Sequence, residues 1–296
     1  MSKPDKVLVA LLQNQNQGSA AANLDTIEQG LREAAAQQVQ LVLLQELHNG
    51  AYFCQHEAVA EFDRAESIPG PSTERLAALA RELGLVVVSS LFERRAAGLY
   101  HNTAVVFDTD GRLAGRYRKM HIPDDPGFLE KFYFTPGDLG FNPIDTEVGR
   151  LGVMVCWDQW YPEAARLMAL AGAELLLYPT AIGWDRADDD DEKSRQRMAW
   201  LLSHRGHAVA NGLPVLSCNR TGFEASPDGN GGIQFWGSSH VLGPQGEILA
   251  EAGSEQPEIL VADVDLARSE HVRRIWPFLR DRRIDAYGDL LRRYRD

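Results

Sequence analysis

The chain has 296 residues, of which 44% are hydrophobic and 24% charged, and its formal net charge is −12. The acidic balance argues against a nucleic-acid partner or an anionic membrane surface. The three cysteines have no paired spacing, and neither a signal peptide nor a membrane-spanning apolar run is present, so we expect a cytoplasmic protein.

In the first half of the chain, short apolar runs predict strands, and apolar residues at helical spacing predict helices. Glu46 follows the second predicted strand, Ser72 is the predicted N-cap of the second helix, and Lys119 follows a hairpin. The predicted elements are strands at 7–12, 40–44 and 85–90, helices at 20–36 and 73–83, and a β-hairpin with arms 101–107 and 113–118.

The second half begins with a buried strand that ends at Cys156. Residues 222–232 are rich in glycine and predict a mobile loop, whereas the acidic run 188–192 is typical of a solvated helix start. The predicted elements are strands at 151–155, 174–178, 215–218 and 259–264, helices at 162–171 and 193–210, and a hairpin with arms 238–242 and 247–250. The two hairpins suggest a duplicated half, and mixed strand directions predict mixed sheets.

Three reactive side chains follow predicted strands, where ligand sites of α/β sheets gather. The Cys156 thiol needs a base and a cation to act as a nucleophile, and Glu46 and Lys119 would supply them. A helix beginning at Pro162 would favour the thiolate through its dipole. The alternatives are an inert buried cysteine and two surface ion-pair residues.

Three segments carry a resemblance to a known family: Q-E-L-H around Glu46, G-R-Y-R-K-M-H-I around Lys119 and G-V-M-V-C-W-D-Q-W-Y-P-E around Cys156. They are similar, in order, to the signature regions of the carbon–nitrogen hydrolase (nitrilase) superfamily. The segments 121–138 and 49–54 resemble its N-carbamoylputrescine amidase branch. The resemblance implies an α/β fold, a four-layer α-β-β-α sandwich with two mixed sheets formed by one domain over 1–296. It also implies a homodimer or larger oligomer, in which the tail from about 275 packs on a neighbouring subunit.

The resemblance also implies catalytic roles. Glu46 would be the general base and Cys156 the nucleophile, while Lys119 and the Trp157 backbone N–H would stabilise the oxyanion. Glu130 resembles a second glutamate of the family, which positions Lys119 and the substrate, although it could be a structural ion-pair residue. No metal or cofactor is implied.

The implied reaction is hydrolysis of N-carbamoylputrescine in polyamine biosynthesis from arginine via agmatine. A small cationic ureido substrate needs acidic acceptors and aromatic faces. Asp124 or the acidic run could also hold its ammonium, and Tyr52 and Trp157 could line its alkyl chain. The expected substrate-binding residues are Tyr52, Asp125, Trp157, Ile182 and Gly183.

Several alternatives stay open. A hydrolase of ω-amides or of carbamoyl amino acids, such as N-carbamoyl-β-alanine, would share the chemistry, and Arg186 could hold the carboxylate of a carbamoyl amino acid. A non-catalytic binding or scaffold protein could retain the fold without the reaction. A thiol redox protein is disfavoured because the chain has no Cys-x-x-Cys pair.

Overall fold

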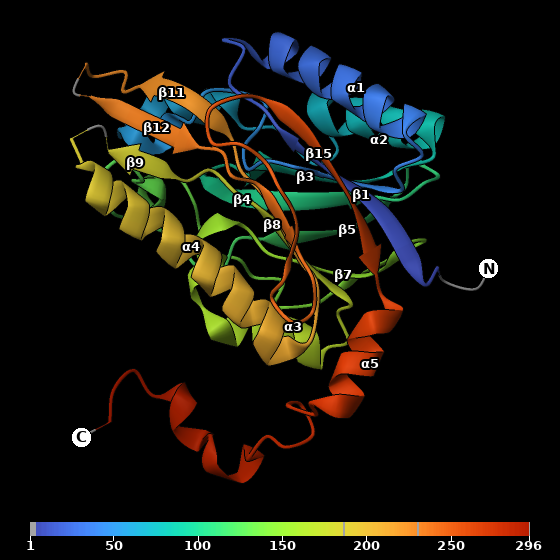
Figure 1. Ribbon diagram of the computed structural model, residues 1–296. Helices are drawn as coiled ribbons and strands as arrows, with labels where there is room; N and C mark the ends of the chain where they lie inside the picture. The colour runs from blue at the N-terminus through green and yellow to red at the C-terminus, as the bar shows by residue number, and fades with distance from the viewer. Residues whose placement is uncertain (1–3, 186, 230, 296) are drawn as a thin grey trace.

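The computed structural model describes residues 4–185, 187–229 and 231–295. These residues form two six-stranded sheets packed face to face, with helices on both outer sides (Figure 1). The first sheet runs in the order β15 (Glu258–Asp265), β1 (Lys6–Gln13), β2 (Leu41–Leu44), β3 (Val86–Ala96), β4 (Leu99–Phe107) and β5 (Leu113–Arg118). The second runs in the order β14 (Ile248–Glu251), β13 (His240–Leu242), β10 (Val215–Cys218), β8 (Leu175–Pro179), β7 (Gly149–Val153) and β6 (Ile144–Thr146).

The helices complete the outer layers of the sandwich. α1 (Ala20–Ala36) and α2 (Pro71–Leu83) cover the first sheet, and α3 (Pro162–Leu170) and α4 (Asp190–Asn211) cover the second (Figure 1). The expected four-layer α-β-β-α sandwich with two mixed sheets is confirmed.

The central strands are mainly apolar because both of their faces are buried. In β1, Val9 and Leu11 belong to the core between the sheets, whereas Ala10 and Leu12 pack in the core beneath α1 and α2. Successive side chains of a strand point to opposite faces, so one short run contributes to both cores.

The two sheets share one pairing pattern, as the predicted duplication requires. In the first, β1, β2 and β3 are parallel and β4 and β5 continue antiparallel, while β15 lies antiparallel on the other side of β1. In the second, β7, β8 and β10 are parallel, β13 and β14 continue antiparallel, and β6 lies antiparallel to β7. Equivalent strand ends of the two halves therefore meet across the sandwich.

Some sequence predictions were wrong in detail. Ser72 is not an N-cap, because α2 begins at Pro71 with Gly70 as its cap, and the Ser72 hydroxyl donates to Glu66 Oε1 (2.6 Å). Much of the predicted mobile loop is ordered as β11 (Thr221–Ala225) and β12 (Gly232–Trp236), which form a small sheet with β9 (Gly183–Asp185). The acidic run 188–192 was interpreted as a solvated helix start, and a helix does begin there. Asp189 caps α4 by accepting from Glu192 N (2.7 Å).

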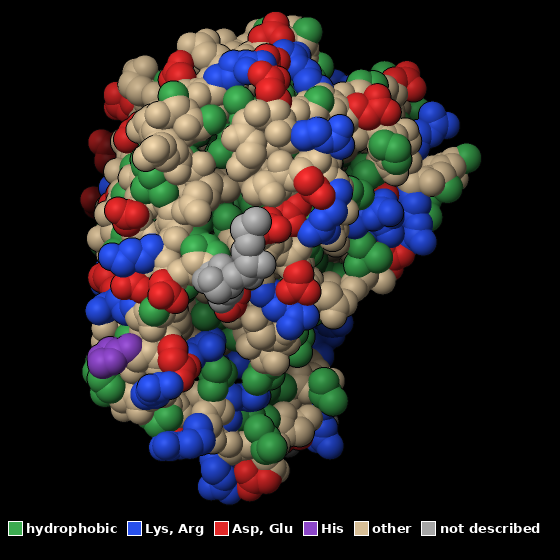
Figure 2. Space-filling model, turned by 90° about the vertical axis from the view of Figure 1, so that its right-hand side faces the viewer, with side chains coloured by type: hydrophobic (Ala, Val, Ile, Leu, Met, Phe, Trp, Pro, Cys, Tyr) green, Lys and Arg blue, Asp and Glu red, His purple; other side chains and the backbone are tan. Residues whose placement is uncertain are grey.

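The C-terminal segment contains α5 (Ala267–Ile275) and then extends away from the layers (Figure 1). Many of its large apolar side chains are exposed, including Trp276, Phe278, Leu290, Leu291 and Tyr294. On the face shown in Figure 2, acidic and basic side chains are interspersed, and basic ones gather at the lower end, where this segment lies in Figure 1. Among the described residues, no helix combines the length and apolarity needed to cross a membrane.

Candidate active site

Four side chains from both halves of the sandwich converge beneath one cavity. Glu46 follows β2, Lys119 follows β5, and Glu130 begins a short 3₁₀ helix, η3 (Glu130–Phe132). The Lys119 Nζ donates to Glu46 Oε1 (2.8 Å) and to Glu130 Oε2 (2.7 Å), and all three side chains are buried. Cys156 follows β7 and starts the 3₁₀ helix η4 (Cys156–Trp160).

The two carboxylates are held by neutral donors as well as by Lys119. Asn102 Nδ2 donates to Glu46 Oε1 (2.7 Å), and the Tyr52 hydroxyl donates to Glu130 Oε1 (2.7 Å). The second oxygen of Glu46, Oε2, is buried and has no hydrogen-bond partner among the residues that the structure describes. Glu46 therefore keeps one oxygen free to accept a proton.

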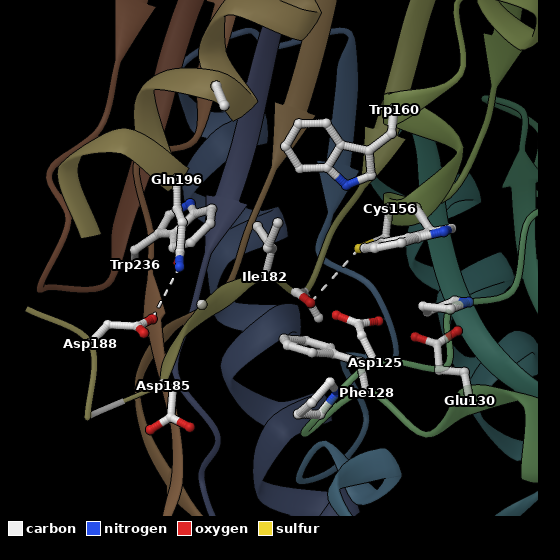
Figure 3. A pocket seen from close by; sticks show the side chains of 16 residues that line it. Asp125, Phe128, Glu130, Cys156, Trp160, Ile182, Asp185, Asp188, Gln196 and Trp236 are labelled. Atoms are coloured by element: carbon white, nitrogen blue, oxygen red, sulfur yellow. Dashed lines mark hydrogen bonds between the residues drawn. The ribbon is translucent and has the colours of Figure 1, made fainter. Parts of the chain in front are cut away.

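The backbone at Cys156 adopts a conformation that non-glycine residues rarely take, with φ of 41°. Its Sγ donates to the Ala181 carbonyl (3.7 Å; Figure 3). Burial, followed by the charge of Glu46, raises the pKa of the thiol well above its usual value. A helix dipole was expected to favour the thiolate, but α3 begins only at Pro162, after η4, and the direction of this pKa opposes a thiolate.

Burial and neighbouring charges act in opposite directions on the pKa values of Lys119 and Glu130. Burial alone would lower the pKa of Lys119, but Glu130 and Glu46 outweigh burial and hold that pKa well above its usual value. Burial raises the pKa of Glu130 to about 7, against the opposing effect of Lys119. Lys119 thus remains an ammonium ion, although water does not reach it.

A cavity of about 460 Å³ opens above these groups (Figure 3). Cys156, Glu130 and Asp125 lie at one end, while Asp185, Asp188 and Gln196 lie at the other. The walls between the two ends are mainly apolar and include Phe128, Trp157, Trp160, Ile182, Gly183 and Trp236.

Comparison with known proteins identifies the family. The carbon-nitrogen hydrolase family profile matches residues 8–274. This chain belongs to the carbon-nitrogen hydrolase family. It is 44% identical over 288 residues to the N-carbamoylputrescine amidase of Solanum lycopersicum, an alignment that covers 96% of this chain and 95% of that protein.

Two further proteins are similar to this carbon-nitrogen hydrolase, one in sequence and one in structure. The citrullinase of Francisella tularensis subsp. tularensis is 40% identical over 290 residues, which cover 97% of this chain and 99% of that protein. The crystal structure of a carbon-nitrogen hydrolase from Helicobacter pylori G27 superposes with a TM-score of 0.96 and 55% identity, covering 98% of this chain and all of that one. The protein is therefore an enzyme that hydrolyses carbon–nitrogen bonds.

The predicted site residues of this carbon-nitrogen hydrolase occupy different positions around the cavity. Asp125, Trp157, Ile182 and Gly183 line it, as do Cys156 and Glu130. Glu46 and Lys119 are fully buried and are not among the lining residues. Tyr52 does not line the alkyl part of the cavity as expected; it is buried against Phe128 and Phe235 and holds Glu130. Arg186 lies outside the described residues.

Three supporting residues of this carbon-nitrogen hydrolase were not predicted from the sequence. Asn102 holds Glu46, and Gln159 contacts Cys156. Arg220 donates to the carbonyl oxygens of Glu46 and Leu47 (both 2.9 Å). The sequence signal available for Gln159 was its spacing of three from the cysteine, whereas Asn102 and Arg220 depend on contacts between distant segments.

Proposed function

We propose that this carbon-nitrogen hydrolase converts N-carbamoylputrescine into putrescine, carbon dioxide and ammonia, in polyamine biosynthesis from arginine via agmatine. The observation that carries the proposal is the polarity of the cavity, which has a thiol and buried charges at one end and two carboxylates at the other. The similarity to N-carbamoylputrescine amidases supports the same substrate.

The first half of the proposed reaction releases ammonia. Glu46 takes the thiol proton, and Cys156 Sγ forms a bond to the ureido carbonyl carbon. The Lys119 ammonium and the Trp157 backbone N–H stabilise the oxyanion. Glu46 then returns the proton to the departing amino group, so the carbon–nitrogen bond breaks and ammonia leaves. The unpaired Oε2 of Glu46 supports its role as proton acceptor.

The second half regenerates the thiol. Glu46 takes a proton from water, and the resulting hydroxide attacks the carbonyl carbon of the S-carbamoyl intermediate. The carbon–sulfur bond breaks, and the sulfur regains a proton from Glu46. The product is an N-alkyl carbamic acid, whose own acidic proton passes to the nitrogen as it decomposes to carbon dioxide and the free amine.

The distal carboxylates match the charge of the proposed substrate. The far amine of N-carbamoylputrescine is an ammonium at neutral pH, and Asp185 and Asp188 would accept its hydrogen bonds. Asp188 Oδ2 is held by Gln196 Nε2 (3.1 Å). No lining residue that the structure describes is Lys or Arg, so the described wall offers no cationic side chain for the carboxylate of a carbamoyl amino acid.

Asp125 is proposed to bind the reacting end of the substrate. Its Oδ1 is buried and finds no hydrogen-bond partner in the described part of the chain, although the residue lines the cavity close to Cys156 (Figure 3). A buried carboxylate oxygen requires a donor, and a ureido group carries N–H donors beside its carbonyl. Trp157 and Trp160 would cover the methylene chain.

A substrate panel with ammonia detection tests the proposal. We expect the highest kcat/KM with N-carbamoylputrescine and much lower values with citrulline, N-carbamoyl-β-alanine and an ω-amide of a dicarboxylic acid. A clear preference for citrulline or N-carbamoyl-β-alanine would refute the proposed substrate while keeping the chemistry. If none of the four releases ammonia, the proposed substrate class would be refuted as well.

We also propose that the protein works in the cytoplasm. All three cysteines are free and buried, which supports a reducing compartment.

A further inference from the structure

Gln159 lies directly beside the sulfur of Cys156. The two residues are three positions apart in η4, and side chains at that spacing eclipse one another in a 3₁₀ helix. The Gln159 Nε2 is 4.0 Å from Cys156 Sγ, and the side chain is fully buried. A buried primary amide thus faces the reacting sulfur.

The surroundings fix which end of this amide faces the sulfur. Trp200 Nε1 lies 2.8 Å from Gln159 Oε1, and Thr180 Oγ1 lies 3.4 Å from the same oxygen. An indole N–H can only donate, so its partner must be the amide oxygen. The amide NH₂ is therefore directed to Sγ.

The backbone of Gln159 is also anchored to α4. His207 Nε2 lies 2.7 Å and Ser203 Oγ 2.8 Å from the Gln159 carbonyl oxygen. Trp200, Ser203 and His207 all belong to α4, so one helix holds both the main chain and the amide. These contacts hold the amide donor beside the sulfur.

We propose that Gln159 stabilises the thiolate of Cys156 with its amide N–H, and that Trp200 is a positioning residue that keeps this donor on the sulfur. A thiol is a weak acceptor, whereas an ionised acceptor forms a much stronger hydrogen bond. The interaction therefore strengthens when Glu46 removes the thiol proton, and it offsets part of the burial that disfavours a charged sulfur. This proposal rests on the nucleophilic role of Cys156 proposed above.

The test measures the rate at which iodoacetamide alkylates Cys156 at a series of pH values, with peptide mass mapping to identify the modified residue. This rate reports the ionisation of the sulfur without any substrate. Gln159→Glu keeps an acceptor for Trp200 but replaces the donor with a carboxylate. We expect the inflection of its rate profile to rise by about one pH unit or more and its rate at pH 8 to fall about tenfold. Gln159→Met, which is uncharged, should show a smaller shift in the same direction, and so should Trp200→Phe.

Ser203→Ala is the matched control, because His207 still donates to the Gln159 carbonyl oxygen and the amide partners Trp200 and Thr180 stay in place. It should retain the wild-type profile, and thermal melting should show that every variant is folded. For N-carbamoylputrescine, Gln159→Met should lower kcat about tenfold with KM within about twofold. Profiles of Gln159→Glu and Gln159→Met that coincide with wild type would overturn the inference, as would an equal shift in Ser203→Ala.

The outcome can be separated from failure of the proposed function. If Cys156→Ala still released ammonia, the proposed reaction would fail, whereas the alkylation profiles would continue to report whether Gln159 acts on the sulfur.

Discussion

At the scale of single residues, the site depends on Lys119, a buried ammonium between two buried carboxylates. Removing charges from water is costly unless they are paired and hydrogen-bonded. Here Asn102 donates one further bond to Glu46 and Tyr52 one to Glu130. The arrangement fixes a positive charge where an oxyanion would form, and it explains why this ion pair is not an ordinary surface pair.

Glu130 should make stability depend on pH. Burial raises its pKa from 4.5 to about 7, so the folded protein binds a proton more tightly at this group than the unfolded chain does. The resulting stabilisation is present below the unfolded pKa and is lost as pH rises through about 7. We predict that Glu130→Gln reduces this loss, measured as the free energy of unfolding in urea between pH 5 and 8. An unchanged pH slope in the variant would contradict the assignment.

Asp188 should recognise charge rather than shape. Asp188→Asn is expected to raise the KM for N-carbamoylputrescine about tenfold, because the acceptor of the ammonium loses its negative charge and the hydrogen bond is weakened. N-butylurea has the same chain length without the ammonium and serves as the matched substrate, whose KM should stay nearly unchanged. Equal effects on both compounds would mean that Asp188 only shapes the cavity wall.

At the scale of elements, the connection between β10 and β11 supports the segment that carries Glu46. Arg220 is buried, pairs with Glu224 Oε1 (2.6 Å) and donates to the Glu46 and Leu47 carbonyls. Glu224 Oε2 in turn accepts from the Tyr52 backbone N–H (2.6 Å). One ion pair thus fixes the main chain on both sides of the segment from Glu46 to Tyr52.

Breaking that pair should damage both stability and activity. We predict that Arg220→Met lowers the free energy of unfolding by about 3–5 kcal/mol, because Glu224 is left as an unpaired buried charge. It should also lower kcat, since Glu46 loses its support. Arg268→Met removes an exposed pair with Glu247 and should cost no more than about 1 kcal/mol. Similar losses in the two variants, measured by urea denaturation, would argue against a special role for Arg220.

The sequence predicted those helices and strands whose apolar residues follow a clear local pattern. α1 and β5 have their predicted bounds, because regular apolar spacing and short bounded runs identify them. β9, β11 and β12 were missed since they are short and glycine-rich and become strands only by pairing with one another. α5 was missed because it buries only Ser269 and Val272, too few apolar side chains to produce a helical period.

The same distinction applies to the site. Glu46, Lys119 and Cys156 could be predicted because reactive side chains directly after strands stand out in the sequence. Asn102 and Trp200 could not, because an asparagine within a strand and a tryptophan within a helix have many ordinary roles. Their functions depend on which distant residue they face.

At the scale of the whole molecule, the duplicated topology explains how the site is assembled. Glu46 and Lys119 come from the first half and Cys156 from the second, and the core between the sheets includes residues from both. We propose that the chain folds as a single domain for this reason. Separating the halves would separate the nucleophile from its base.

The exposed apolar tail predicts self-association. We propose that the segment from about 275 packs on a neighbouring subunit, because monomeric proteins rarely expose so many large apolar side chains together. Light scattering should show a dimer or larger oligomer, and Leu290→Asp with Leu291→Asp should shift it towards smaller species. Val59→Asp changes an exposed apolar residue elsewhere and should have no effect. A monomeric wild-type protein would contradict this proposal.

The central claim is that the sulfur of Cys156 is the nucleophile of the reaction. Ammonia release from N-carbamoylputrescine by Cys156→Ala tests it most directly, with circular dichroism to confirm the fold. We predict a folded protein with no release above background, because Cys54 and Cys218 are buried and neither lines the cavity, so neither can replace the nucleophile. Ammonia release by the folded variant at a rate near that of wild type would contradict the account.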